Sequence, residues 1–219
     1  MVKPHKKLPN GYEDLPGYAC LPRMSPLLCV GNQYGASLSD FDIVISTITP
    51  KDRSGRLNSK LSSFALLFED EHGRESASEA TLAQERIVEG AALVATAIKA
   101  RRHTLVHCEW GQNRSGSICC AFAVLYLQWS AKDAIKYLRA QNHAQRQYVG
   151  QSPMSNPCFN RLMLKLEKQR AKIVLSQEQR KKRCARSGFS TARCLRPCKR
   201  SSLGKVHPRF TKRLPRQAA

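Results

Sequence analysis

Short apolar runs alternate with longer periodic segments through the middle of this chain. Runs of apolar and β-branched residues bounded by Gly, Pro or polar clusters predict strands. Such runs occupy residues 26–32, 41–49, 63–68 and 104–108. Apolar residues spaced three and four apart predict helices over residues 81–102, 114–129 and 131–141, and from Asn156 onward. Strands separated by helices, with the last helices consecutive, predict an α/β fold with a central mixed, mostly parallel sheet flanked by helices on both faces.

The segments before and after residues 20–169 differ from this central domain in composition. Residues 1–19 hold repeated Pro and Gly turn signals and predict an extended leader. Residues 170–219 hold 16 Lys or Arg and one acidic residue, so they carry +15 of the formal net charge of +21. Apolar periodicity fades there, and we predict a basic, largely disordered tail whose helix continues at most to about Arg183.

The composition also predicts where the protein resides. The longest uninterrupted apolar run, Cys119–Leu127, has nine residues, whereas a membrane span needs about 20. The basic N-terminal residues lack the apolar segment of a secretory signal. Nine cysteines, an odd number, favour reduced thiols over a disulfide framework. We expect a monomer in the nucleus, the cytoplasm or both, without membrane association.

Residues 105–120, LVHCEWGQNRSGSICC, place a cysteine in the loop between a predicted strand and a predicted helix. Open α/β sheets bind ligands at such loops, because the first N–H groups of the helix lack partners and the helix dipole favours an anion. A thiol in this position ionises readily, and the planar guanidinium of Arg114 suits two phosphate oxygens. The spacing from Cys108 to Arg114, with Gly111 at the tight point, predicts a nucleophile beside a phosphate-binding loop.

These residues carry a resemblance to a known family. The segment HCEWGQNRSG resembles the active-site loop of the cysteine-dependent protein tyrosine phosphatases, and its flanks resemble the small dual-specificity branch. The matching flanks are PLLCVGN, SICCAFAVLYLQWSAKDAIKYLRAQ and SNPCFNRLMLKLE. The resemblance covers roughly residues 20–169 and implies a protein tyrosine phosphatase-like fold for that domain.

The resemblance also implies a role for each residue of the loop. Cys108 is the nucleophile that forms a cysteinyl-phosphate intermediate, and Arg114 binds the phosphate and the transition state. Ser115 stabilises the thiolate as it leaves, and His107 is supporting structure that tunes the thiolate through hydrogen bonds. The expected phosphate-binding loop comprises Glu109, Trp110, Gly111, Gln112, Asn113 and Arg114.

In this family an aspartate on an upstream loop protonates the leaving group and then activates water. Asp70 follows a predicted strand and is assigned that role. It precedes Cys108 by 108 − 70 = 38 residues, a longer gap than the family usually has, with the excess in EHGRESASE at residues 71–79. The neighbouring acids and bases remain alternatives: Glu69, Glu71 and His72.

Three alternative functions are considered for a protein with these residues. The leading one is a protein phosphatase that hydrolyses phosphotyrosine and phosphoserine or phosphothreonine, with phosphoproteins as partners. The alternative is an RNA 5′-triphosphatase or polynucleotide phosphatase of the same superfamily, because Asn113 precedes Arg114 and the basic tail offers a site for RNA or another polyanion. A non-catalytic phosphate-binding module would require loss of Cys108 or Arg114, and both are present.

No cofactor or metal is expected for any of these functions. The cysteines and histidine of the tail lack the paired short spacings of a zinc module: Cys184, Cys194, Cys198 and His207.

Overall fold

The structure is a computed structural model that describes residues 17–33, 41–49, 64–70, 76–146 and 152–186. The chain divides into two units after Ala171. The first unit contains the sheet, three whole helices and the start of a fourth, and the site is built entirely from it. Among the described residues, no helix is long and apolar enough to cross a membrane.

Five strands form one sheet in the order β1-β2-β5-β3-β4. Their bounds are Tyr18–Cys20 (β1), Leu28–Asn32 (β2), Ile43–Ser46 (β3), Phe64–Ala65 (β4) and Thr104–Cys108 (β5). The β1–β2 pair is antiparallel and the other three pairs are parallel. The central strand β5 is buried along its whole length, so its carboxyl end brings Cys108 to the edge where the parallel strands finish.

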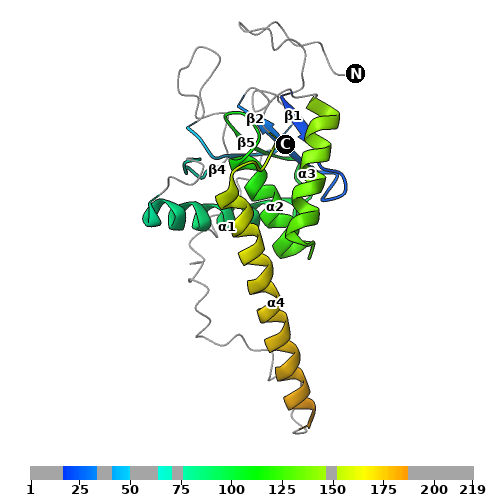
Figure 1. The fold of residues 1–219 in the computed structure, drawn as a ribbon. Helices are drawn as coiled ribbons and strands as arrows, with labels where there is room; N and C mark the ends of the chain where they lie inside the picture. The colour runs from blue at the N-terminus through cyan, green and yellow to red at the C-terminus, as the bar shows by residue number, and fades with distance from the viewer. Residues whose placement is uncertain (1–16, 34–40, 50–63, 71–75, 147–151, 187–219) are drawn as a thin grey trace, which may run out of the picture. The chain divides into compact units, whose positions relative to one another are not determined.

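In the described part of the chain, four helices accompany the sheet (Figure 1). They are α1 (Ala77–Lys99), α2 (Arg114–Tyr126), α3 (Ala131–Arg146) and α4 (Pro157–Arg186). Helix α2 is central, and ten of its residues, Ser115 to Val124, are buried. Gly90 of α1 permits close approach of the two helices, because a Cβ there would lie 2.7 Å from Cδ1 of Ile118 on α2.

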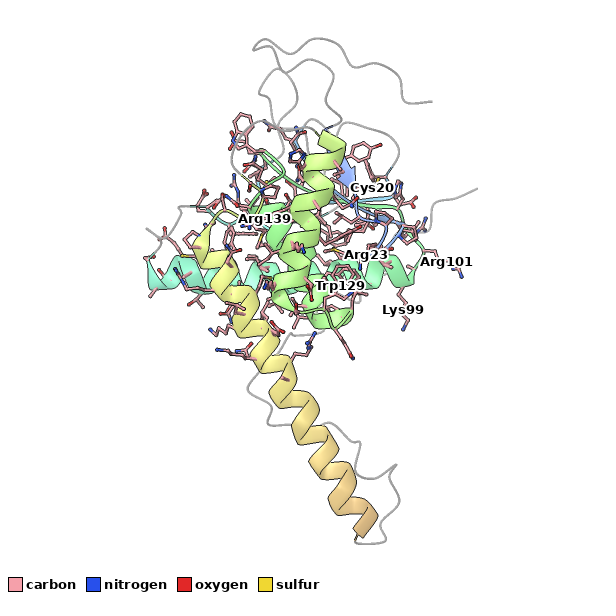
Figure 2. The ribbon with its side chains drawn as sticks, turned by 45° about the vertical axis from the view of Figure 1, so that its right-hand side comes forward. Cys20, Arg23, Lys99, Arg101, Trp129 and Arg139 are labelled. Atoms are coloured by element: carbon pink, nitrogen blue, oxygen red, sulfur yellow. The ribbon has the colours of Figure 1, made fainter. Side chains whose placement is uncertain are left out.

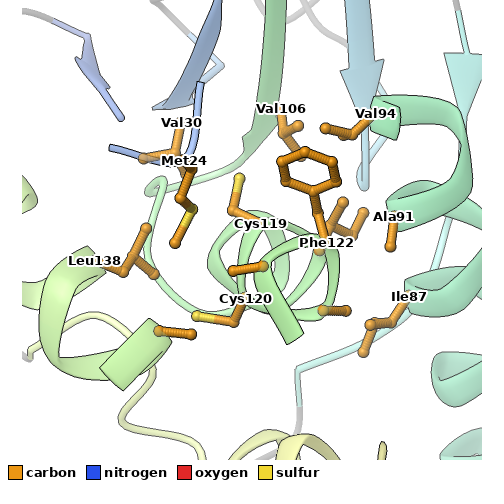
Figure 3. Close-up of a cluster of buried hydrophobic side chains, with 14 of the residues drawn as sticks. Met24, Val30, Ile87, Ala91, Val94, Val106, Cys119, Cys120, Phe122 and Leu138 are labelled. Atoms are coloured by element: carbon orange, nitrogen blue, oxygen red, sulfur yellow. The ribbon is translucent and has the colours of Figure 1, made fainter. Parts of the chain in front are cut away.

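The hydrophobic core fills the space between the helices and one face of the sheet (Figure 3). Cys119 of α2 points toward Val30 and Val106 of the sheet, and Cys120 points toward Leu138 of α3. A smaller cluster on the other side of the strands contains the buried residues Cys29, Val44 and Leu105. At the β1–β2 turn, the guanidinium of Arg23 lies 5.5 Å from the ring centroids of Trp129 and of Tyr137 (Figure 2). These contacts fix α2 and α3 against the sheet.

The predicted α/β fold is confirmed, with a mixed, mostly parallel sheet flanked by helices. The strands and helices differ from their predicted bounds at several ends, and two differences have a clear physical reason. Strand β1 was not expected, and it includes the last two residues of the segment predicted as a leader. Helix α1 begins at Ala77 rather than near Thr81, because Ser76 and Glu79 form a capping box that satisfies the first N–H groups.

Helix α4 ends at Arg186, close to the limit expected at Arg183. The leader residues 1–16 and the tail residues 187–219 lie outside the described residues. The three-part domain division and the disorder of the tail therefore stay predictions.

Candidate active site

A tight loop connects the end of β5 to the start of α2. The strand ends at Cys108 and the helix begins at Arg114, so the loop has room for only five residues between them. Gly111 lies in the middle with a φ of 69°, a left-handed conformation that glycine adopts without the cost other residues incur. The backbone turns back at this point, which directs the Gly111 amide toward the sulfur.

The Cys108 sulfur lies at the bottom of this loop and is almost fully buried. Two polar groups contact it: the Gly111 N–H donates to Sγ at 3.1 Å, and the Ser115 hydroxyl lies 3.3 Å away. Ser115 itself is fully buried on the first turn of α2. The sulfur therefore faces hydrogen-bond donors and the amino end of a helix, which stabilise negative charge placed there.

The Arg114 side chain spans from the loop to the segment that follows β4. Its Nη1 donates to the Phe68 carbonyl at 3.5 Å. Carboxylates lie on either side of the guanidinium, with Glu69 at 3.9 Å from Nη1 and Glu109 at 3.6 Å from Nη2. The Arg114 side chain is 12% exposed, whereas those of Glu69 and Glu109 are 70% and 49% exposed. Both carboxylates can therefore leave the guanidinium for water when a phosphate binds.

Asp70 is held in the site region by a residue far along the chain. Asn156, at the start of α4, donates from Nδ2 to Asp70 Oδ1 at 2.7 Å. The Oδ1 atom of the same asparagine accepts the Cys158 N–H at 2.8 Å, which caps α4. Asn156 is fully buried, so its amide has a fixed orientation and positions the carboxylate.

Asn113 holds the loop between β5 and α2 against the segment before α4. Its side-chain oxygen accepts the Ser155 N–H at 2.8 Å, the Ser155 hydroxyl at 3.3 Å and the Asn156 N–H at 3.3 Å. A second brace comes from α3, where Nδ2 of the buried Asn142 donates to the Gly111 carbonyl at 3.2 Å. The Asn113 side chain is therefore turned toward the protein, and only its backbone is left for a ligand.

The other predicted loop residues fall into two groups. Glu109 and Trp110 are exposed at the rim, and half of the Trp110 surface is accessible. Gln112 is buried, and its Nε2 has no hydrogen-bond partner within the described part of the chain. The loop thus brings together all the residues that the sequence assigned to it. Two of the alternatives to Asp70, Glu71 and His72, lie outside the described residues.

His107 directly precedes Cys108 and is fully buried. Burial lowers the pKa of its imidazole to about 4, so the ring is neutral at neutral pH. Among the described residues, neither ring nitrogen makes a hydrogen bond of regular geometry, but an interaction with the backbone of Cys108 partly offsets the effect of burial on the pKa. The ring is supporting structure behind the loop, and its tuning of the thiolate through hydrogen bonds stays a prediction.

Cys119 and Cys120 are core residues of α2. Both are fully buried. Burial raises the pKa of the Cys120 thiol to about 12 and that of Cys119 well above its usual range. Both remain protonated at neutral pH and are unsuited to act as nucleophiles.

Sequence reasoning missed the residues that support the site from a distance. The pattern Asn156-Pro157 was interpreted only as a helix start, and nothing pointed to Asn142 or Ser155. Asn156 lies 86 residues from its partner Asp70, Asn142 lies 31 from Gly111, and Ser155 lies 42 from Asn113. A local sequence pattern does not predict contacts at such separations.

The arrangement suits attack by sulfur on a bound phosphate. A thiol lies at the amino end of α2, a guanidinium opens the same helix, and a carboxylate is held on a neighbouring loop. Within the described ranges, no group of three or more His, Cys, Asp or Glu side chains could hold a metal ion.

Comparisons with known proteins agree with this chemistry. The family model described as "Dual specificity phosphatase, catalytic domain" matches residues 31–169. A mouse protein assigned to the dual specificity phosphatases and crystallised with zinc tungstate is similar in structure, with a TM-score of 0.52 and 17% identity over 77% of this chain and 94% of that one. Human DUSP28 is similar with a TM-score of 0.51 and 18% identity, over 70% and 94% of the two chains. No curated protein sequence matches this chain.

Proposed function

Because this chain belongs to the family of dual specificity phosphatase catalytic domains, we propose that it hydrolyses phosphotyrosine and phosphoserine or phosphothreonine in proteins through a cysteinyl-phosphate intermediate. The observation that carries the proposal is the environment of the Cys108 sulfur. Gly111 N–H and the Ser115 hydroxyl contact this sulfur at the amino end of α2, and Arg114 opens the same helix.

Substrate binding begins with an exchange of partners at Arg114. Without substrate, the guanidinium is shared between Glu69 and Glu109. A phosphate dianion offers a bidentate partner with more charge, and charge-assisted bonds of this kind are among the strongest in proteins. The backbone N–H groups of the loop at the amino end of α2 add further donors. Together they place phosphorus above the buried sulfur.

In the first chemical step, Cys108 Sγ attacks phosphorus as the bond to the substrate oxygen breaks. An S–P bond forms, and Asp70 gives its proton to the departing phenol or alcohol oxygen. Arg114 stays bound to the equatorial oxygens, where charge is spread in the transition state.

In the second step, water gives a proton to Asp70 and its oxygen attacks phosphorus. The S–P bond breaks, inorganic phosphate forms, and the electron pair returns to sulfur as a thiolate. The Ser115 hydroxyl, 3.3 Å from this sulfur, donates to the thiolate as it leaves.

Phosphoproteins are the proposed partners, in the nucleus, the cytoplasm or both. The presence of Asp70 favours this over RNA 5′-triphosphatase activity, because phosphoanhydride leaving groups need less help from an acid. The hydrogen bond from Asn156 supports a catalytic position for that carboxylate. The basic tail remains a proposed contact for RNA or another polyanion, with binding that weakens steeply as salt increases.

The test compares wild type and Cys108→Ser on three substrates at matched concentration. These are a phosphotyrosine peptide, a phosphothreonine peptide and a 5′-triphosphorylated RNA. The proposal predicts phosphate release from both peptides by wild type, none by Cys108→Ser, and slower release from the RNA. Much faster cleavage of the RNA would contradict the proposal and identify the protein as an RNA 5′-triphosphatase or polynucleotide phosphatase. Peptide binding without hydrolysis would make the protein a phosphate-binding module.

A further inference from the structure

Two cysteines outside the active site face each other across β1 and β2. Cys20 and Cys29 are register partners in this antiparallel pair, and their sulfur atoms lie 2.8 Å apart. Both are reduced thiols. They lie with the smaller apolar cluster, where Cys29 is fully buried and Cys20 is partly exposed. Figure 2 labels Cys20 on β1, shortly before Arg23.

The strand pairing brings the two backbones close enough for a disulfide. Leu21 N–H donates to the Leu28 carbonyl at 2.8 Å, and Asn32 N–H donates to the Gly17 carbonyl at 2.7 Å. Hydrogen-bonded and non-hydrogen-bonded residue pairs alternate along antiparallel strands. The pair Leu21–Leu28 is hydrogen-bonded, so the next pair along the strands, Cys20–Cys29, is a non-hydrogen-bonded pair. The two Cα atoms of such a pair are typically about 4.5 Å apart. This separation falls within the range of roughly 4.4–6.8 Å that disulfide-bonded cysteines show.

The surroundings make one of the two thiols the reactive one. Its hydrogen bond with Cys29 lowers the pKa of Cys20 to about 7, with help from the nearby His103 and against the effect of burial. The same hydrogen bond and burial raise the pKa of Cys29 well above its usual range. His103 Nε2 lies 3.8 Å from the Cys29 sulfur. Cys20 is therefore the more exposed and more readily ionised member of the pair, and Cys29 is held beside it as a protonated thiol.

We propose that Cys20 and Cys29 form a peroxide-reactive thiol pair that closes into a reversible cross-strand disulfide. In the first step the Cys20 thiolate attacks one oxygen of hydrogen peroxide, the O–O bond breaks, and a sulfenic acid and hydroxide form. In the second step the Cys29 sulfur attacks the Cys20 sulfur, the S–O bond breaks, and water leaves with the Cys29 proton. The two thiols lose two electrons, and the peroxide is reduced to two molecules of water.

The geometry also indicates that the bond is easily reduced again. Because Cys20 is partly exposed, reductants can reach the bond, and exposed disulfides have more oxidising potentials. The pair lies on strands that lead to the active site, since Asn32 of β2 is the register partner of Cys108. It uses none of the residues assigned to phosphate hydrolysis, so it constitutes a separate modification site.

The full-length chain offers a direct test because trypsin cleaves between the two cysteines, at Arg23. Cys20 is the only cysteine of peptide 8–23, and Cys29 is the only cysteine of peptide 24–51. The protein is treated with one to five equivalents of hydrogen peroxide at neutral pH, alkylated, digested without reductant and examined by mass spectrometry. The proposal predicts that the linked pair 8–23/24–51 becomes the main oxidised species and disappears after dithiothreitol.

Two variants sharpen the result. In Cys29→Ser the linked pair is lost, and dimedone traps the sulfenic acid on peptide 8–23. Cys158→Ser is the matched control, since it removes another partly exposed thiol and leaves the yield of the linked pair unchanged. The proposal is overturned if peroxide oxidises peptide 103–114, which contains Cys108, while the linked pair stays absent from wild type. This readout on wild type does not depend on the folding of any variant.

Discussion

Asn156 donates a 2.7 Å hydrogen bond from its amide to the carboxylate of Asp70. The two residues lie 86 positions apart along the chain, and Asn156 is fully buried. The neighbouring Asn113 accepts the Asn156 backbone N–H. The carboxylate is thereby connected to the phosphate-binding loop through rigid, buried groups, which is how an active site keeps its reacting groups in register.

Removal of the Asn156 donor should slow turnover more than it weakens binding. We predict that Asn156→Ser lowers kcat about tenfold with little change in KM, because a hydrogen bond to a charged group contributes roughly 1.5–3 kcal/mol. Serine can still cap α4, so the free energy of unfolding should change little. The measurement is steady-state kinetics together with urea unfolding. Asn160→Ala, which removes a bond to the Met154 carbonyl, is the matched control; equal losses of kcat in both variants would contradict a positioning role.

The role of Asp70 as general acid can be tested by varying the leaving group. We predict that Asp70→Asn slows hydrolysis of a phosphothreonine peptide by roughly 10²–10⁴-fold. The same variant should lose much less on p-nitrophenyl phosphate, whose phenolate leaves without a proton. Glu69→Gln is the control from the adjacent position and should not discriminate between the substrates. Equal loss on both substrates would exclude Asp70, and a selective loss in Glu71→Gln or His72→Asn would transfer the role.

Buried His107 should make stability depend on pH. Burial lowers the pKa of this imidazole from 6.5 to about 4 on folding. Between these pH values the unfolded chain binds a proton at His107 and the folded chain does not. Stability is therefore full above pH 6.5 and decreases as pH falls from 6.5 toward 4. Between pH 7 and pH 5 we expect a loss of about 2 kcal/mol from this residue.

Urea unfolding at the two pH values measures this loss. His107→Phe should show a correspondingly smaller decrease, because phenylalanine fills a similar volume without titrating. His143→Asn, on the exposed side of α3, should behave like wild type. An unchanged decrease in His107→Phe would show that other groups cause the pH dependence.

The sequence predicted the parts of the site that are close together along the chain. The strand before Cys108, the turn at Gly111 and the helix from Arg114 onward are encoded within a short segment, so their relative placement follows from local geometry. The contacts of Ser115 with the sulfur follow from the same turn. The α/β order of the sheet was predictable for a related reason, since apolar runs and periodic segments define strands and helices directly.

The parts that were missed depend on contacts between distant segments. Strand β1 has only three residues. It forms because its backbone pairs with the free edge of β2, and this pairing cannot be predicted from the composition of so short a segment. The side-chain roles of Asn113, Asn142 and Asn156 depend on how α3 and α4 pack beside the loop. Glu109 and Arg114 are close together in the sequence, which is compatible with an ion pair between them. The geometry of that ion pair depends on how the loop turns.

The central claim is that Cys108 carries the phosphate during turnover. Rapid acid quench of the wild-type enzyme with excess phosphotyrosine peptide, followed by digestion and mass spectrometry, tests it directly. Tryptic peptide 103–114 contains Cys108 as its only cysteine. The account predicts phosphate on that peptide in wild type and in the Cys158→Ser control, and none in Cys108→Ser. Turnover by wild type without phosphate on peptide 103–114, or undiminished turnover by Cys108→Ser, would contradict it.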